Sequence, residues 1–232
     1  LYVQFGGAVG VHSGLGASGM TIMADLAQIL ALAEPVLPWH TDRQPVLELV
    51  GAVDAVAVAA EKTALDIALL CQSEIGELSE PTAPGVGGSS HKRNPVACAR
   101  IRAAARQIHG HHGVILNAGA QPLERGLGEW HAEWAPLLDS VLSLEGALES
   151  MVPLIEGLEV HEETMTRNLR LSGGAIMADP AMRLLLDIMD SGKAQDLANR
   201  ASEKARHERR DYAEVLLEFP EITGRLDPDT TR

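Results

Sequence analysis

The sequence predicts an all-α fold, a bundle of long helices followed by a smaller helical domain. Of the 232 residues, 46% are hydrophobic but only 3% are aromatic, so Ala, Leu, Val, Ile and Met must build the core. Such a core suits close-packed helices better than sandwiches or barrels, whose strands favour aromatic and β-branched side chains. Apolar residues also recur at spacings of three and four along much of the chain, and no segment has a convincing strand pattern.

The first half of the chain contains the longest predicted helix. A glycine-rich stretch over 6–19 precedes a helix over 20–33, which Pro35 and Pro38 end. Helical spacing then continues over 46–79 almost without interruption. At 1.5 Å per residue this helix would reach about 50 Å. Its broad apolar face needs neighbouring helices, which predicts a bundle and oligomerisation.

A glycine-rich loop over 81–90 precedes the second long helix. Asn94 is a favoured N-cap residue and Pro95 a favoured first helical residue, so we expect that helix to begin there and to end near residue 116. A third long helix is expected over 130–155, either starting at Pro136 or bent there.

Gly157 marks a break between two predicted domains. Beyond it we expect shorter helices over 161–171, 175–189 and 193–219. The predicted domains are a long-helix bundle over 1–158 and a smaller helical domain over 159–232. The opening residues do not look like a natural start, and we expect upstream sequence to be missing.

Charge and cysteine content narrow the functional classes. The chain has 19 Lys and Arg against 32 Asp and Glu, a net charge of −13, which disfavours nucleic-acid and anionic-membrane partners. Its apolar stretches are interrupted by charge well short of a membrane span. Cys71 and Cys98 are too few for a disulfide framework or a cysteine metal site. We therefore expect a cytoplasmic protein.

The segment over 85–95 contains three features that attract anions. Its glycines let backbone N–H groups turn toward a ligand, and Asn94-Pro95 opens a helix whose N-terminus is partly positive. Lys92 and Arg93 add full charges. The segment therefore predicts a site for a small carboxylate or phosphate. The alternative is a flexible surface loop with incidental basic residues.

Two other motifs have simpler explanations than a cofactor or a metal. Gly14, Gly16 and Gly19 match a dinucleotide-binding fingerprint, but the chain lacks the preceding strand and following βαβ unit that this fingerprint needs. The loop over 85–95 also lacks P-loop spacing. The histidines at 109, 111 and 112 indicate a polar helix end rather than a metal site. We expect neither cofactor nor metal.

The segment over 87–95, Gly-Gly-Ser-Ser-His-Lys-Arg-Asn-Pro, resembles the signature loop of the fumarase/aspartase superfamily. Further segments are similar to the muconate-cycloisomerase branch and follow its order, namely 4–8, 38–41, 74–77 and 127–134. The Trp-His-Ala-Glu-Trp run that begins at Trp130 favours this branch over purine-pathway lyases. The resemblance extends over nearly the whole chain, and family members are considerably longer at the N-terminus.

The resemblance implies a fold, an assembly and a set of site residues. Members form long-helix bundles that tetramerise, with each active site shared between subunits and occupied by a small polycarboxylate. Ser89 corresponds to the family's proton-transfer residue, while Lys92 and Asn94 correspond to substrate-contacting residues. We expect further substrate contacts from Gln4, His40, Arg43, Ser90, His91, Arg125 and Trp130.

The implied reaction converts 3-carboxy-cis,cis-muconate into a carboxymuconolactone, as in aromatic-compound degradation. Two alternatives stay open: a superfamily lyase that releases fumarate from a succinyl-type substrate such as adenylosuccinate, and a non-catalytic structural relative. Leu123 and Gly126 flank the Glu-Arg pair where the muconate branch usually has His and Ser, which leaves the substrate open.

The signature loop departs from its family in length. The family places three residues between the positions of Ser90 and His91, where this sequence has none. A true deletion would pull Ser89 toward Lys92 and is incompatible with the predicted catalysis. If three residues are instead missing from the sequence, the Cα atoms of Ser90 and His91 would be separated by up to roughly 13 Å.

Overall fold

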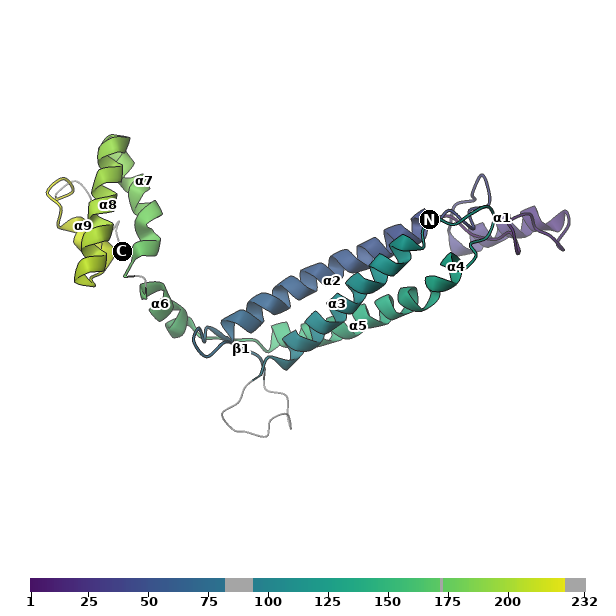
Figure 1. The fold of residues 1–232 in the computed structure, drawn as a ribbon, viewed down its shortest axis with the longest axis horizontal. Coiled ribbons are helices and arrows are strands. Elements are labelled where there is room, and N and C mark those ends of the chain that lie inside the picture. The colour runs from purple at the N-terminus through teal and green to yellow at the C-terminus, as the bar shows by residue number, and fades with distance from the viewer. Residues whose placement is uncertain (82–93, 172, 224–232) are drawn as a thin grey trace. The chain divides into compact units, whose positions relative to one another are not determined.

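The computed structural model describes residues 1–81, 94–171 and 173–223, and helices dominate it (Figure 1). This confirms the predicted all-α class. The chain forms two compact units. Unit 1 comprises Leu1–Gln72 and Leu78–Glu159, and unit 2 comprises Ser73–Glu77 and the chain from Val160 onward. No described helix is long and apolar enough to cross a membrane.

Three long helices form the body of unit 1: α2 (Gln44–Leu70), α3 (Val96–Asn117) and α5 (Trp134–Glu156). The 27 residues of α2 span about 40 Å. This helix was predicted over 46–79 but ends nine residues earlier, because the chain turns after Cys71 and passes through Gly76 at φ 61°. Glycine adopts that left-handed conformation without strain.

Small side chains allow the three helices to pack closely. Ala57 of α2 and Ala105 and Ile108 of α3 are buried together, with Val53 and Leu144 packed against them. Because alanine adds little bulk beyond the backbone, the helix axes can approach closely. The predicted core of small aliphatic residues is confirmed here.

The two ends of the bundle have different neighbours. Helices α1 (Ser18–Leu30) and α4 (Glu129–Ala132) lie at the end where α2 begins, and strand β1 (Leu78–Ser79) lies at the other (Figure 1). α1 is attached through a small core of Val3, Met23 and Ala27. The indole of Trp39 also donates a hydrogen bond to the Val3 carbonyl at 2.9 Å.

The start of α3 differs from the prediction. The helix begins at Val96, Pro95 is its N-cap residue, and the Asn94 side chain does not cap it. Instead, the carboxylate of Glu80 accepts hydrogen bonds from the backbone N–H groups of Ala97 (3.1 Å) and Cys98 (2.8 Å). Glu80 therefore supplies the negative charge that a helix N-terminus favours. Two N–H groups of the helix N-terminus that was predicted to attract an anion are therefore occupied by Glu80.

Replacing Glu80 with alanine should destabilise the fold by about 1–2 kcal/mol, because two N–H donors of α3 lose their acceptor. Denaturant unfolding measures this change. Glu74, an exposed glutamate with no hydrogen bond in the described structure, provides the matched control. Equal stability of the Glu80→Ala and Glu74→Ala proteins would contradict the capping role.

Unit 2 consists of short helices. After strand β2 (Glu159–Val160), which pairs with β1, come α6 (Glu162–Arg170), η1 (Ala175–Met177), α7 (Ala178–Ile188), α8 (Ser191–Glu208) and α9 (Tyr212–Leu217). The single helix predicted over 193–219 is wrong. Arg209 adopts a left-handed conformation at φ 55° and ends α8, and the Asp211 carboxylate then caps α9.

Candidate active site

His40 is the most constrained of the predicted site residues. His40 is only 8% exposed, and its Nε2 atom lies 3.0 Å from the Gly7 carbonyl oxygen. Because a carbonyl can only accept, Nε2 carries the proton and Nδ1 presents a lone pair. Nδ1 is buried and has no hydrogen-bond partner among the described residues. Burial, and then the charges of Arg125 and Arg43, lower the pKa of His40, which favours this neutral form.

Two glycines hold the imidazole in place. A Cβ atom on Gly6 would lie 2.7 Å from the His40 ring and 2.7 Å from the Gly10 Cα. Gly10 has φ 84°, and a Cβ there would lie 2.6 Å from Pro38. The first glycines of the chain therefore serve close packing around His40, and neither position has room for a side chain.

Gly6→Ala should displace the His40 ring and lower kcat/KM by at least about tenfold, since a shift of about 1 Å in a positioned group is costly. Steady-state kinetics measures this, with circular dichroism to verify folding. Gly51→Ala is the control, because a Cβ there meets nothing within 4 Å in this chain. Native kinetics in Gly6→Ala would show that the close packing is unimportant.

Arg125 and Trp130 lie beside the same glycine-rich loop. The Arg125 guanidinium donates to the Ala8 carbonyl, with Nε at 3.0 Å, and lies 4.3 Å from the centre of a Trp130 ring. That distance permits a cation–π interaction. Trp130 in turn meets Trp134 edge-on at 5.0 Å. Arg125 is thus held by weak neutral partners, and its charge remains available to an anion.

Arg43 is held differently from Arg125. Its guanidinium forms a two-pronged pair with Glu133, with distances of 3.1 Å and 2.5 Å, and also donates to the His40 carbonyl at 3.1 Å. The two side chains are 8% and 3% exposed. These partners occupy the guanidinium fork, so the geometry supports a role in positioning His40. The predicted substrate contact by Arg43 stays a prediction.

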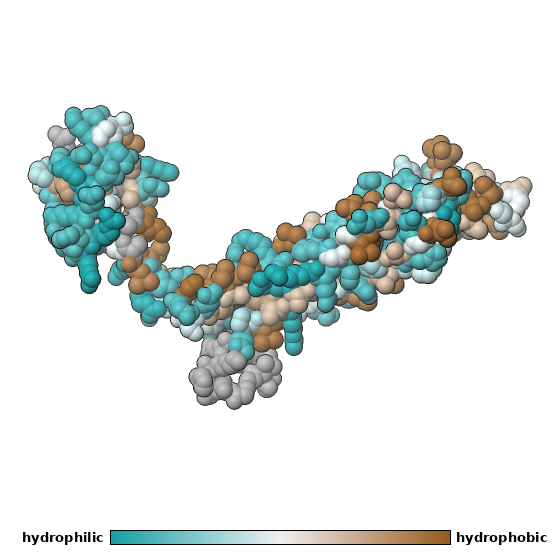
Figure 2. All heavy atoms as spheres, viewed as in Figure 1, coloured by the Kyte–Doolittle hydropathy of each residue, from teal (hydrophilic) through white to brown (hydrophobic). Residues whose placement is uncertain are grey.

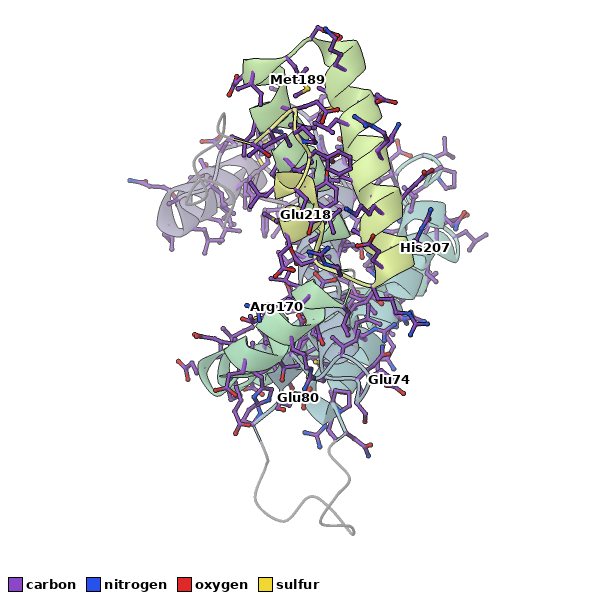
Figure 3. All side chains as sticks on the ribbon, turned by 90° about the vertical axis from the view of Figure 1, so that its left-hand side faces the viewer. Glu74, Glu80, Arg170, Met189, His207 and Glu218 are labelled. Carbon is purple, nitrogen blue, oxygen red and sulfur yellow. The ribbon has the colours of Figure 1, made fainter. Side chains whose placement is uncertain are left out.

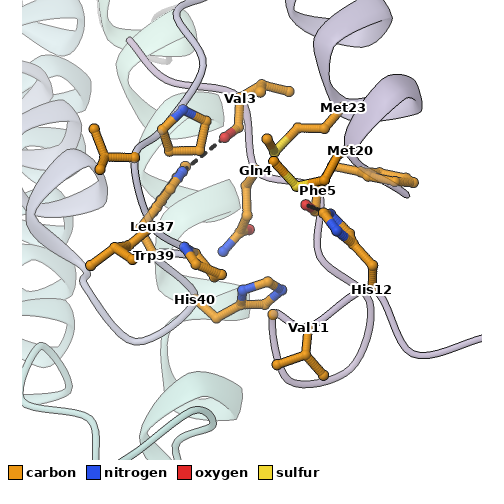
Figure 4. Close-up of a pocket in the computed structure, with 14 residues that line it drawn as sticks. Val3, Gln4, Phe5, Val11, His12, Met20, Met23, Leu37, Trp39 and His40 are labelled. Carbon is orange, nitrogen blue, oxygen red and sulfur yellow. Dashed lines mark hydrogen bonds between the residues drawn. The ribbon is translucent and has the colours of Figure 1, made fainter. Parts of the chain in front are cut away.

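A cavity of about 240 Å³ adjoins His40 (Figure 4). Its polar lining includes Gln4, His12 and His40, and apolar side chains such as Met20 and Trp39 form much of the rest. Figure 4 shows the three polar side chains around one space. We call the group formed by Gln4, His40, Arg43, Arg125 and Trp130 the histidine site. The structure brings these five predicted residues together at one end of unit 1.

Asn94, the other predicted site residue that the structure describes, lies at the opposite end of the bundle. Asn94 is exposed and immediately precedes α3, which runs antiparallel to α2 (Figure 1). The length of α2, about 40 Å, therefore separates Asn94 from the histidine site of the same chain. Ser89, Ser90, His91 and Lys92 lie outside the described residues, as does the Ser90–His91 junction.

The comparisons with known proteins identify the family. A lyase family profile matches residues 1–110. A 3-carboxy-cis,cis-muconate cycloisomerase of Pseudomonas aeruginosa is 38% identical over 99% of this chain and 50% of its own length. The crystal structure of a 3-carboxy-cis,cis-muconate lactonizing enzyme of Pseudomonas putida matches all of this chain and 52% of that one, at 38% identity and a TM-score of 0.88. The chain belongs to the fumarase/aspartase superfamily.

A second relative, equally similar in sequence, is named for a different enzyme activity. A nitrosuccinate lyase of Streptomyces davaonensis is 38% identical over 97% of this chain and 50% of its own length. The chain spans about half the length of the curated relatives described here.

Sequence reasoning missed two residues near the superfamily motifs. Glu133 lies inside the Trp-His-Ala-Glu-Trp run, where a charged residue among aromatic ones signals a buried partner, and that partner is Arg43. Glu80 precedes the signature loop and gave no signal of its own, because its hydrogen bonds cross to residues 17 and 18 positions away.

The histidines of α3 have partners that the sequence did not predict. His109 and His112 both contact the Asp54 carboxylate of α2, and His109 also contacts Glu61. The hydrogen bond that His109 donates to the Asp54 carboxylate raises the pKa of His109. Within the described ranges, no group of three or more His, Cys, Asp or Glu side chains is arranged to hold a metal ion. This network links two bundle helices by charge.

Proposed function

We propose that the full-length protein is a cycloisomerase that converts 3-carboxy-cis,cis-muconate into a carboxymuconolactone. The main support is the histidine site, where the muconate-branch motifs around Gln4, His40 and Trp130 come together beside the Arg125 charge. A relative named for this activity is 38% identical over 99% of the chain. The site offers a cation, a buried imidazole and an aromatic wall, which suit a conjugated polycarboxylate.

In the proposed reaction, a substrate carboxylate oxygen bonds to one carbon of a C=C bond as the π bond breaks. Negative charge then develops at the neighbouring carbon beside a second carboxylate. Lys92 and Asn94 stabilise this charge, and Ser89 donates the proton that completes the addition. Arg125 binds a substrate carboxylate through its planar fork. The His40 imidazole, whose Nε2 donates to the Gly7 carbonyl, forms part of the wall of the adjoining cavity.

One subunit cannot assemble this site alone. The histidine site and Asn94 are separated by the length of α2, about 40 Å, which is far longer than the substrate. We therefore propose a cytoplasmic homotetramer whose active sites combine the signature loop of one subunit with the histidine site of another. The bundle has apolar side chains to bury in such contacts (Figure 2), including Leu138, Leu142 and Val152 of α5 and Val58 of α2.

Mixing two inactive variants tests the shared site. If Ser89→Ala and Arg125→Ala subunits are unfolded and refolded together, hybrid assemblies should regain about a quarter of native activity, because a random fraction of sites then combines two native residues. The control pair is Ser89→Ala with Lys92→Ala. Both changes lie in one loop, so every hybrid site keeps a defect and activity should stay low. If neither mixture regains activity, the proposal of a shared site is refuted.

A direct assay tests the reaction. Loss of the conjugated diene absorbance of 3-carboxy-cis,cis-muconate reports lactonisation, and the lactone product is identified by NMR. The second candidate is a lyase acting on a succinyl-type substrate such as nitrosuccinate, favoured by the nitrosuccinate lyase relative and by Leu123 and Gly126 beside Arg125. Turnover of nitrosuccinate without turnover of the muconate would select this candidate.

A further inference from the structure

Unit 2 contains a cavity with a basic lining. It has a volume of about 520 Å³ and lies where α6 and α8 end and α9 begins. Four arginines line it, namely Arg170, Arg206, Arg209 and Arg210. None of the described residues that line it is acidic. Figure 3 shows Arg170 and His207 near the ends of the two helices that border it.

This concentration of positive charge contrasts with the chain as a whole, in which 32 acidic residues outnumber 19 basic ones. Placing four guanidinium groups around one cavity is unfavourable unless something offsets their repulsion. Arg210 has such partners, since it contacts Glu218 at 2.6 Å and Glu208 at 3.3 Å. Within residues 1–81, 94–171 and 173–223, the other three arginines form no ion pair.

A buried hydroxyl lies in the same wall. Tyr212 is 1% exposed and lines the cavity. Its hydroxyl has no hydrogen bond of acceptable geometry among the described residues, although Ser202 lies beside it and also lines the cavity. Leaving a buried hydroxyl without a hydrogen bond is unfavourable. Because this oxygen is buried, the feature that the cavity offers to a ligand is its unpaired positive charge.

Helix dipoles account for part of this arrangement only. Basic side chains near the C-terminal ends of α6 and α8 offset the negative poles of those helices. That effect accounts for Arg170 in the last turn of α6, and for Arg206 and Arg209 at the end of α8. It does not account for these guanidinium groups sharing one cavity with no carboxylate among its described lining residues.

We propose that this cavity binds a small oxyanion with two or more negative charges, a phosphate or a polycarboxylate group. Guanidinium groups bind such oxyanions through paired, charge-assisted hydrogen bonds. The volume lies within the range of small-molecule sites, about 300–1,000 Å³. The cavity is lined by unit 2 alone, so this proposal does not depend on the histidine site or on the proposed reaction.

Isothermal titration calorimetry of the full-length protein at low ionic strength tests the proposal, with inorganic phosphate and citrate as separate probes. The test variant is Arg170→Ala with Arg206→Ala. The control is Arg167→Ala with Arg183→Ala, which removes the same charge from the same unit without touching the cavity. We expect the native and control proteins to bind at least one probe. The test variant should bind it at least about a hundredfold more weakly, roughly tenfold per arginine.

The outcomes separate the ligand classes and the sites. Preference for phosphate or for citrate assigns the ligand class. If citrate binding is lost in Arg125→Ala rather than in the test variant, the citrate site is the histidine site. That result overturns the proposal for citrate. No binding of either probe at millimolar concentration, or equal weakening in test and control variants, overturns the proposal as a whole.

Discussion

Replacing Ser89 with alanine is expected to lower kcat by about 10²–10⁴-fold while leaving the fold and assembly intact, because the change removes the group that carries the proton. Steady-state kinetics with 3-carboxy-cis,cis-muconate measures this, and light scattering reports the assembly. KM should change far less than kcat, since the hydroxyl contributes mainly to the transition state.

Ser150→Ala is the matched control for this prediction. Its hydroxyl donates to the Gly146 carbonyl on the exposed side of α5, so its loss should leave kinetics unchanged. Near-native kcat in Ser89→Ala would remove the proton-transfer role. If the muconate is not turned over by the native protein, the same pair of variants should be measured with nitrosuccinate, where Ser89 is expected to matter equally because elimination reverses the same kind of proton transfer.

Local sequence pattern predicted the long helices well and their ends less well. Spacing of three and four residues suffices to locate α2, because its burial depends on one continuous apolar face. The start of α3 instead depends on Glu80, a contact from outside the helix that outweighed the local Asn94-Pro95 signal. The break after α8 depends on Arg209 in a left-handed conformation, for which an arginine gives no local signal.

The candidate site shows a similar division between motif and geometry. Motifs were sufficient to select His40, Arg125 and Trp130, which the fold brings together. Only the fold shows that Asn94 lies at the other end of α2. It also shows that Arg43 is bound by Glu133, a residue 90 positions away. Such long-range pairs depend on how helices pack, and single-sequence periodicity carries no information about them.

Glu133→Gln should destabilise the protein by about 3–5 kcal/mol, because it leaves the buried Arg43 guanidinium without its counter-charge. Denaturant unfolding measures the change. Glu145→Gln is the control, because Glu145 is exposed and lies on the same helix. This change should shift the free energy of unfolding by less than about 0.5 kcal/mol.

A double replacement then separates stability from positioning. Arg43→Met with Glu133→Leu removes both charges and fills the space with apolar atoms, and such exchanges are often neutral or stabilising. We expect the double variant to recover most of the stability lost in Glu133→Gln. It should remain at least about tenfold below native kcat/KM, because the hydrogen bond from Arg43 to the His40 carbonyl is gone and the backbone that carries the ring is held less firmly. Native kcat/KM in the stable double variant would show that Arg43 holds the fold and has no part in placing His40.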